Sequence, residues 1–182
     1  DYSHPFLIKN EKAKKRGIIV VSTDKGLCGG LNTNVFRKTL NKIREIESDG
    51  NEVEALAIGN KAVSFLSRID VKIISSYTQI GDTPDIQELN GAIKIIVDNY
   101  KNGSLKEIHL FYNNFVNTMS QDPTEEKYLP LSSKDLEPVN EYFWDYLYEP
   151  EAAVVIDDLL LRYTETLVYQ AVVENIASEQ SA

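Results

Sequence analysis

The most reactive side chain in this sequence is a cysteine that stands in a glycine-rich turn. Residues 26–30 (GLCGG) follow an apolar, β-branched run and precede an amphipathic stretch, which is the context of a G-x-C-x-G nucleophile elbow. A thiol nucleophile needs a base. His4 lies near the start of the chain and His109 falls inside an alternating strand pattern, whereas a late loop would suit a triad base better. A tight turn with a small apolar Cys28 is therefore the preferred interpretation, and a cysteine hydrolase stays as an alternative.

The same turn could cradle a phosphate, because glycines before a helix N-terminus present backbone N–H groups and a favourable dipole. The sequence contains neither G-x-x-x-x-G-K-[ST] nor G-x-G-x-x-G, the two motifs that usually mark nucleotide sites of this kind. A nucleotide-binding α/β domain is the second alternative.

Asp157 and Asp158 are adjacent, but neighbours on a helix point about 100° apart, so we expect solvated carboxylates and no metal site.

Aromatic side chains crowd the region before the last helical segment. They are Tyr142, Phe143, Trp144, Tyr146 and Tyr148. One connection can hardly bury so many rings against its own domain. The residues alone leave two interpretations open, a partner surface and a satellite cluster of the core.

The elements that must position these residues alternate between extended and helical periodicity over residues 16–116, the pattern of a sheet covered by helices. Residues 17–22 (GIIVVS) predict a central strand that is buried on both faces. Further strands are expected at 54–58, 71–75, 108–115 and 127–131. Three helices are expected between them: one at 31–48, a short one that follows Gly59-Asn60, and one that opens at residues 83–85 and runs to Gly103. We predict an α/β fold, with a three-layer, Rossmann-like arrangement around a mostly parallel sheet of about five strands.

Local signals predict several boundaries. Thr83-Pro84-Asp85 offers a cap residue, a proline at the first helical position and an acid in the first turn. Asp122-Pro123 indicates a turn before the last strand. The basic run from Lys9 to Arg16 is expected to be a solvated loop or a guard on an edge strand.

From residue 151 the chain has helical periodicity, with apolar side chains over more than half of the circumference. At about 1.5 Å per residue such a helix is longer than the sheet, so we expect one side to pack on the sheet and the excess to meet another helix. The chain starts without Met and ends at Ala182 among good helix formers,. We expect an excised fragment that forms a single domain over residues 1–182.

The composition is that of one ordinary folded domain. The 182 residues, 42% of them hydrophobic, suffice for one core,. The formal net charge of −9 makes nucleic acid a poor partner,. One cysteine excludes an internal disulfide,. No apolar run approaches the roughly 18 residues of a membrane span, so we expect a protein that is soluble or peripheral to a membrane.

Several segments resemble, in the same order, the gamma subunit of the F-type ATP synthases of bacteria and organelles. They are His4-Pro5, residues 21–32 (VSTDKGLCGGLN), 117–121 (NTMSQ), 144–150 (WDYLYEP) and 170–180 (QAVVENIASEQ). Residues 21–32 resemble the family's SDRGLCGGLN segment. The resemblance covers essentially the whole chain, and several motifs in order are far more specific than any one of them.

The resemblance implies a part of a rotor that is not itself an enzyme. In this family a proton-driven ring of c subunits grips the foot of gamma, and a shaft of two long helices forces the catalytic sites through binding, synthesis and release. The catalytic residues lie in the beta subunits, so no cofactor or small-molecule ligand is expected here. Residues 151–182 would begin the C-terminal shaft helix. The resemblance also implies a location peripheral to the inner (plasma) membrane, on the cytoplasmic side in bacteria.

Two interfaces follow from the same resemblance. The foot, which meets the ring and the epsilon subunit, would comprise Tyr142, Trp144, Tyr146, Tyr148 and Glu149. The turn with Lys25 and Cys28 is similar to the part near the collar of the alpha and beta hexamer, where Lys25 would pair with beta carboxylates. The chloroplast type of regulation uses a pair of cysteines and is not expected with Cys28 alone.

Overall fold

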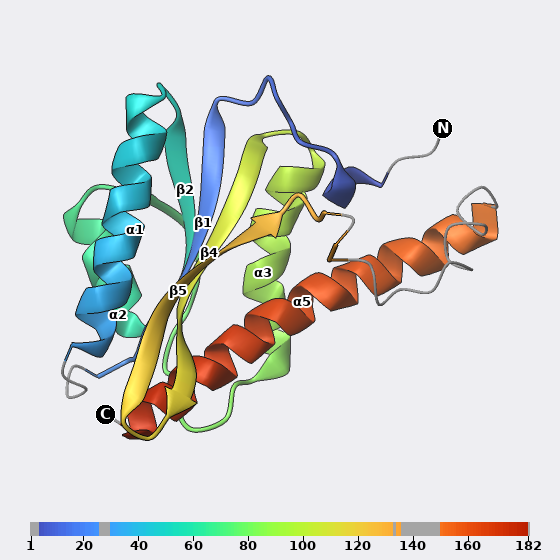
Figure 1. Cartoon of the computed structure of the whole chain (residues 1–182). Coiled ribbons are helices and arrows are strands. Elements are labelled where there is room, and N and C mark those ends of the chain that lie inside the picture. Colours follow the sequence, from blue (N-terminus) through green and yellow to red (C-terminus); the bar gives the residue numbers. More distant parts are fainter. Residues whose placement is uncertain (1–3, 26–29, 133, 136–149, 182) are drawn as a thin grey trace.

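The computed structural model describes residues 4–25, 30–132, 134–135 and 150–181. Within them the chain forms a twisted sheet with helices on both faces (Figure 1). The strands are β1 (Lys15–Val21), β2 (Glu52–Ile58), β3 (Lys72–Tyr77), β4 (Leu105–Asn117) and β5 (Ser120–Leu129). The helices are the 3-10 turn η1 (Pro5–Leu7) and the α-helices α1 (Leu31–Ser48), α2 (Asn60–Arg68), α3 (Ile86–Lys101) and α5 (Pro150–Ser181).

The sheet has five strands in the order β3-β2-β1-β4-β5. β1 pairs in parallel with β2 and with β4, and β2 pairs in parallel with β3. Only β5 runs antiparallel, against β4. The prediction of a mostly parallel sheet of about five strands is confirmed, and β1 is central as its β-branched sequence indicated.

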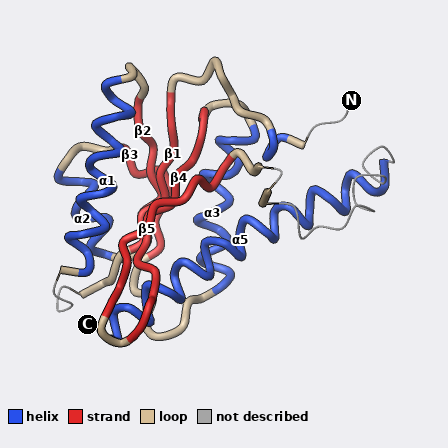
Figure 2. The backbone as a smooth tube through the Cα atoms, viewed as in Figure 1, coloured by secondary structure: helices blue, strands red, loops and turns tan. Residues whose placement is uncertain are grey.

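Helices cover the sheet in two separate layers. α1 and α2 lie on one face, and α3 and α5 lie on the other (Figure 2). Each face has its own apolar core: Ile18 and Val20 of β1 point to the first, and Ile19 and Val21 point to the second. This alternation is the period-two consequence of a strand buried on both sides, and it gives the three-layer, Rossmann-like arrangement that was predicted.

Two predicted boundaries were wrong. Helix α3 is capped by Asp85, whose carboxylate accepts hydrogen bonds from the backbone N–H groups of Gln87 and Glu88 at 3.0 and 3.2 Å, so Thr83 and Pro84 precede the helix. Asp122 and Pro123 lie inside β5. Proline is tolerated there because β5 is an edge strand whose outer side needs no ladder bond, and the turn falls at residues 118–119 instead.

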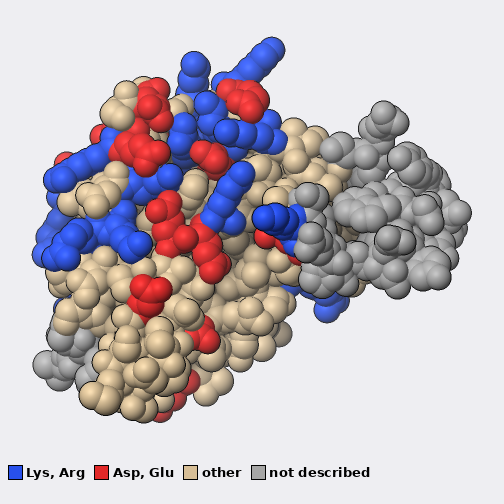
Figure 3. All heavy atoms as spheres, in the orientation of Figure 1, with Lys and Arg blue, Asp and Glu red and all other residues tan. Residues whose placement is uncertain are grey.

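The basic run is a solvated loop only in part. Lys9, Lys12 and Lys14 are exposed in the loop before β1, as expected. Lys15 and Arg16 belong to the central strand β1 and pair with buried carboxylates, so they guard no edge. On the face shown in Figure 3, Lys and Arg side chains gather in the upper part of the view, over the amino ends of the strands. The tip of the β4–β5 hairpin, at the bottom, is largely uncharged.

Helix α5 crosses the second face of the sheet and extends past it (Figure 1). Its buried stripe includes Val168, Ala171 and Val172, which belong to the core under that face. Its opposite side exposes the apolar side chains of Val155, Leu159 and Val173, which are 57%, 41% and 41% exposed. Val154 lies on the same side as the buried stripe but near the start of the helix, and it is 71% exposed,. Among the described residues, no helix is long and apolar enough to cross a membrane.

Candidate functional site

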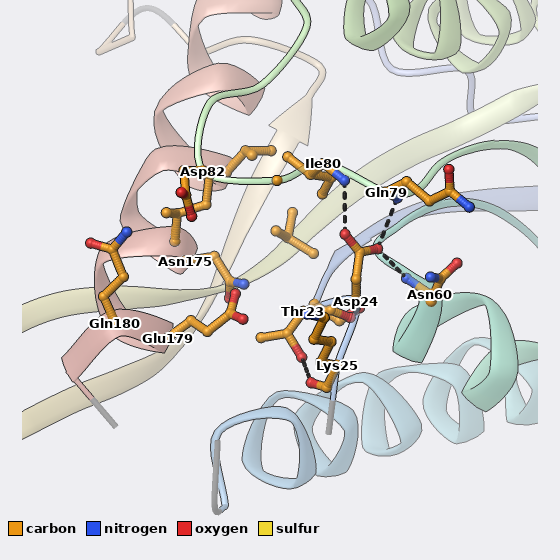
Figure 4. A pocket seen from close by; sticks show the side chains of 15 residues that line it. Thr23, Asp24, Lys25, Asn60, Gln79, Ile80, Asp82, Asn175, Glu179 and Gln180 are labelled. Atoms are coloured by element: carbon orange, nitrogen blue, oxygen red, sulfur yellow. Dashed lines mark hydrogen bonds between the residues drawn. The ribbon is translucent and has the colours of Figure 1, made fainter. Parts of the chain in front are cut away.

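A hollow lies at the carboxyl ends of the parallel strands. It has a volume of about 570 Å³. Its walls are the segments that follow β1, β2 and β3, and the C-terminal part of α5 (Figure 4). In open α/β sheets, ligands bind at this edge, near the point where the strand order reverses. This hollow, here called the carboxyl-end crevice, is therefore the first place to look for a site.

The carboxylate of Asp24 occupies the position in this crevice that an anion would take. Its Oδ1 accepts hydrogen bonds from the backbone N–H groups of Asn60 and Gln79, both at 3.0 Å, and its Oδ2 accepts one from Ile80 at 2.7 Å. Asn60 is the first residue of α2, so the carboxylate sits at a helix N-terminus, where the dipole favours negative charge. The donor at the start of α2 is thus used by a carboxylate of the chain itself.

The entry to α2 is packed too tightly for any side chain except hydrogen at Gly59. Its φ is +93°, and a Cβ there would lie 2.4 Å from the carbonyl oxygen of Ser22. The Ser22 hydroxyl accepts a hydrogen bond from the Ala62 N–H at 2.8 Å and can donate to the Ile58 carbonyl at 3.1 Å. These contacts lock α2 against the ends of β1 and β2, and they hold the Asn60 donor in place for Asp24.

A second clamp joins the end of β1 to the start of α1. The Thr23 N–H donates to the Asn32 Oδ1 at 3.2 Å, and the Asn32 Nδ2 donates to the Thr23 hydroxyl at 2.8 Å. Thr23 precedes residues 26–29 in the chain and Asn32 follows them, so these hydrogen bonds join the two ends of that segment. Ser22, Thr23 and Asp24 thus fix the starts of α1 and α2.

The thiol hypothesis depends on a histidine, and both histidines have other contacts. His4 is 1% exposed; its Nε2 lies 2.8 Å from the Asp157 Oδ1, and its Nδ1 accepts the Phe6 N–H at 3.1 Å. Burial lowers the pKa of His4, more than the Asp157 carboxylate raises it. The Nδ1 acceptor fixes a neutral ring that donates from Nε2. His4 thus holds the N-terminal segment against α5 through Asp157. The Asp157 side chain is still 46% exposed, so it is a solvated carboxylate that also has a partner.

His109 belongs to an ionic cluster on the opposite face of the sheet, toward α1. Its Nδ1 lies 3.2 Å from the Glu125 carboxylate and its Nε2 lies 3.8 Å from Glu107. Burial lowers its pKa first, and Lys42 lowers it further. Neither His109 nor His4 lines the carboxyl-end crevice. In the part of the chain that the structure describes, no group of three or more His, Cys, Asp or Glu could hold a metal ion.

The structure places one of the predicted interface residues. Lys25 lines the carboxyl-end crevice, at the end of the segment after β1. The other residue of the predicted collar interface, Cys28, lies outside the described residues. The same holds for the predicted foot, Tyr142, Trp144, Tyr146, Tyr148 and Glu149. Both interfaces therefore stay predictions.

Sequence reasoning missed Asp24. The available signal was its place, an acid three residues after a buried parallel strand, where the carboxyl ends of neighbouring strands converge. Its partners could not be read from the sequence, since they lie 36, 55 and 56 residues away.

Comparison with known proteins gives consistent matches over the whole chain. The family model described as ATP synthase matches residues 1–182. The chain is 52% identical over 189 residues to the ATP synthase gamma chain of Paraburkholderia phymatum and 54% identical over 184 residues to that of Methylibium petroleiphilum. All of this chain is covered in both cases, but it spans only 64% and 63% of those relatives.

Solved structures share the fold. The central stalk and c-ring structure of the Tetrahymena thermophila mitochondrial ATP synthase contains a chain that matches with a TM-score of 0.68 at 23% identity, over 94% of this chain and 76% of that one. A chain of the Euglena gracilis mitochondrial ATP synthase rotor matches with a TM-score of 0.63 at 16% identity, over 94% of this chain and 65% of that one. At such identities the likeness is one of fold.

Proposed function

The chain belongs to the ATP synthase family, among its gamma chains, and from this premise we propose that it is part of a rotor. In that role it passes torque between an ion-driven membrane ring and a catalytic hexamer, during synthesis or hydrolysis of ATP. The similarity to ATP synthase gamma chains suggests this role, and the apolar surface of α5 supports it on physical grounds.

The observation that carries the proposal is the two-sided apolar surface of α5. The helix has 32 residues, a length of about 48 Å at 1.5 Å per residue. One side is buried against the sheet, and the other exposes Val155, Leu159 and Val173. A helix that is apolar on two sides needs partners on both. A second long helix alongside residues 151–182 would supply the missing partner, and the two helices together would form a shaft. Residues 1–182 as a whole would form a single globular domain from which this shaft starts.

The carboxyl-end crevice supports a role without catalysis in this chain. Its Asn60, Gln79 and Ile80 backbone donors already bind Asp24, and neither His4 nor His109 lines it. A thiol mechanism would need one of those histidines as a base. Catalysis in the assembly would then take place in the beta subunits.

The proposed partners are the alpha and beta subunits, the epsilon subunit and the ring of c subunits. Lys25 and Cys28 would face the hexamer. The foot would be the segment that contains Tyr142, Trp144, Tyr146, Tyr148 and Glu149. The assembly would keep the chain peripheral to the inner (plasma) membrane, on its cytoplasmic side in bacteria.

A binding experiment with the epsilon subunit of the same organism tests the proposal. We expect the parent chain to retain epsilon in a pull-down and the Trp144→Ala, Tyr146→Ala double variant to retain at least tenfold less, because aromatic anchors dominate interface energies. The matched control is Met119→Ala, which removes a side chain that is 93% exposed on the β4–β5 hairpin.

Circular dichroism would verify that all three proteins are folded. Equal retention of epsilon by the double variant and the parent would contradict the proposal that Trp144 and Tyr146 belong to the epsilon interface. No retention by the folded parent would contradict the rotor assignment itself.

A further inference from the structure

Basic side chains gather at one edge of this acidic chain, over the amino ends of the strands (Figure 3). Residues 8–16 contain five basic side chains and a single acid, Glu11. Two of the five, Lys15 and Arg16, already pair with carboxylates. The other three are exposed, and with a half-buried lysine at the start of β4 they form no ion pair within the described part of the chain. These four side chains, here called the lysine edge, are Lys9, Lys12, Lys14 and Lys106.

The loop that presents three of these lysines is fixed to the fold. The Tyr100 hydroxyl donates a hydrogen bond to the Ile8 carbonyl. The Asn10 Nδ2 donates to the carbonyls of Tyr100 at 3.1 Å and of Leu105 at 2.8 Å, which ties the loop to the connection between α3 and β4. Lys106 follows Leu105 directly. The four lysines therefore lie on two adjoining segments whose backbones are held together.

An exposed apolar side chain lies next to the lysines. Ile8 is 43% exposed, although its backbone is anchored. Protein interfaces are depleted in lysine and are anchored by aromatic side chains and arginine, and the one arginine of this loop, Arg16, is 13% exposed and pairs with Glu107. Surfaces that bind anionic bilayers instead combine lysines with apolar side chains. The composition of the lysine edge thus favours a lipid surface over an acidic protein.

We propose that the lysine edge binds the anionic headgroups of a lipid bilayer. The ammonium groups contact headgroup phosphates, and the Ile8 side chain enters the interfacial layer between them. Each lysine close to an anionic bilayer strengthens binding about fivefold. The contact lies on a different surface from the proposed foot and collar residues, and it does not depend on the rotor assignment.

The net charge of −9 does not prevent such a contact. Asp24, Asp82 and Glu179 line the crevice at the opposite, carboxyl ends of the strands. β1 has seven residues, so the two ends are separated by about 23 Å at 3.3 Å per residue. The screening length in 0.1 M salt is about 10 Å. A bilayer that touches the lysine edge is therefore screened from the acids at the other end.

Co-sedimentation of the chain with vesicles made of equal parts phosphatidylglycerol and phosphatidylcholine tests the proposal. We expect binding in 0.1 M salt and release in 1 M salt, where the screening length falls from about 10 to 3 Å. Lys12→Gln, Lys14→Gln should weaken the binding about 25-fold, fivefold for each lysine. The matched control is Arg37→Gln, Lys38→Gln, which removes the same charge at exposed sites of α1, about 15 Å before its end at the amino edge, and should change the affinity little.

Two further comparisons separate a bilayer from an acidic protein. Ile8→Ser should weaken binding to the vesicles about fivefold, because the exposed part of the side chain no longer leaves water, and soluble poly-glutamate, which has no apolar layer, should bind the chain far more weakly than the vesicles do. Poly-glutamate binding as tight as vesicle binding would reassign the lysine edge to an acidic protein.

Equal affinities of the parent and the double lysine variant would overturn the site, and so would equal binding to vesicles of phosphatidylcholine alone. Circular dichroism would verify that each variant is folded. Retention of epsilon is measured separately, so a failure of vesicle binding leaves the rotor assignment as it stands.

Discussion

Carboxylates at the two ends of the parallel strands have different kinds of partner. At the amino ends, side chain meets side chain: Glu54 lies 3.6 Å from Lys15 and 3.3 Å from Lys72, and Arg16 lies 3.2 Å from Glu107. At the carboxyl ends, the Asp24 carboxylate meets backbone N–H groups. Backbone donors are fixed by the fold, whereas lysine side chains keep rotamer freedom. The carboxyl end is thus built for a fixed geometry, and the amino end tolerates rearrangement.

The largest effect should follow from crowding the carboxyl end. Gly59→Ala adds a methyl group 2.4 Å from the Ser22 carbonyl oxygen at a φ of +93°. We expect a loss of about 4 kcal/mol in the free energy of unfolding, from backbone strain and overpacking together. Chemical denaturation with urea measures it.

The control for this variant is Gly103→Ala. Gly103 has a similar φ of +88°, but nothing lies within 4 Å of its added Cβ. It should lose only about 1–2 kcal/mol, the cost of a left-handed backbone. Equal losses at the two glycines would mean that close contact with Ser22 contributes nothing.

A medium effect should distinguish the two ends by their response to salt. Asp24→Ala takes the acceptor from three backbone donors, of which the Ile80 N–H is part-buried, and should cost about 2 kcal/mol,. Glu54→Gln loosens pairs with lysines whose side chains are 38% and 69% exposed and should cost about 1 kcal/mol.

Raising the salt from 0.1 to 1 M shortens the screening length from about 10 to 3 Å. The loss in Glu54→Gln should shrink in 1 M salt, and the loss in Asp24→Ala should persist. If the loss of stability in Asp24→Ala also vanished in 1 M salt, the charges at both ends of the strands would be held by screened electrostatic attraction alone.

The smallest effect concerns pH. Burial holds the pKa values of His4 and His109 below their ordinary value, so the folded chain binds fewer protons than the unfolded one. Their contribution to stability is complete above the unfolded pKa, about 6.5, and is lost as the pH falls below it.

Comparing the parent with His4→Gln by thermal unfolding between pH 5 and 8 isolates one of the two histidines. Glu165 and Glu179, whose raised pKa values act in the opposite direction, are common to both proteins. The parent should lose more stability than the variant as the pH falls. Parallel curves would show that the pKa of His4 is the same in the folded and the unfolded chain.

The layers of the fold could be read from the sequence because they depend on local patterns. The β-branched run of β1 and the apolar faces of α1 and α3 specify a sheet with helices on both sides. The site could not be read in the same way. Asp24 binds donors up to 56 residues away, and His4 meets Asp157 across 153 residues. Asp122 and Pro123 have turn chemistry, yet pairing with β4 places them inside a strand, since tertiary pairing outweighs local preference.

Asp24 makes the chain its own ligand. In a nucleotide-binding fold of this topology, stability rises with the concentration of the bound phosphate, by mass action. Here the carboxylate is covalently part of the chain, so its effective concentration at the start of α2 is set by the backbone and not by dilution. The start of α2 therefore has its acceptor without any ligand from solution.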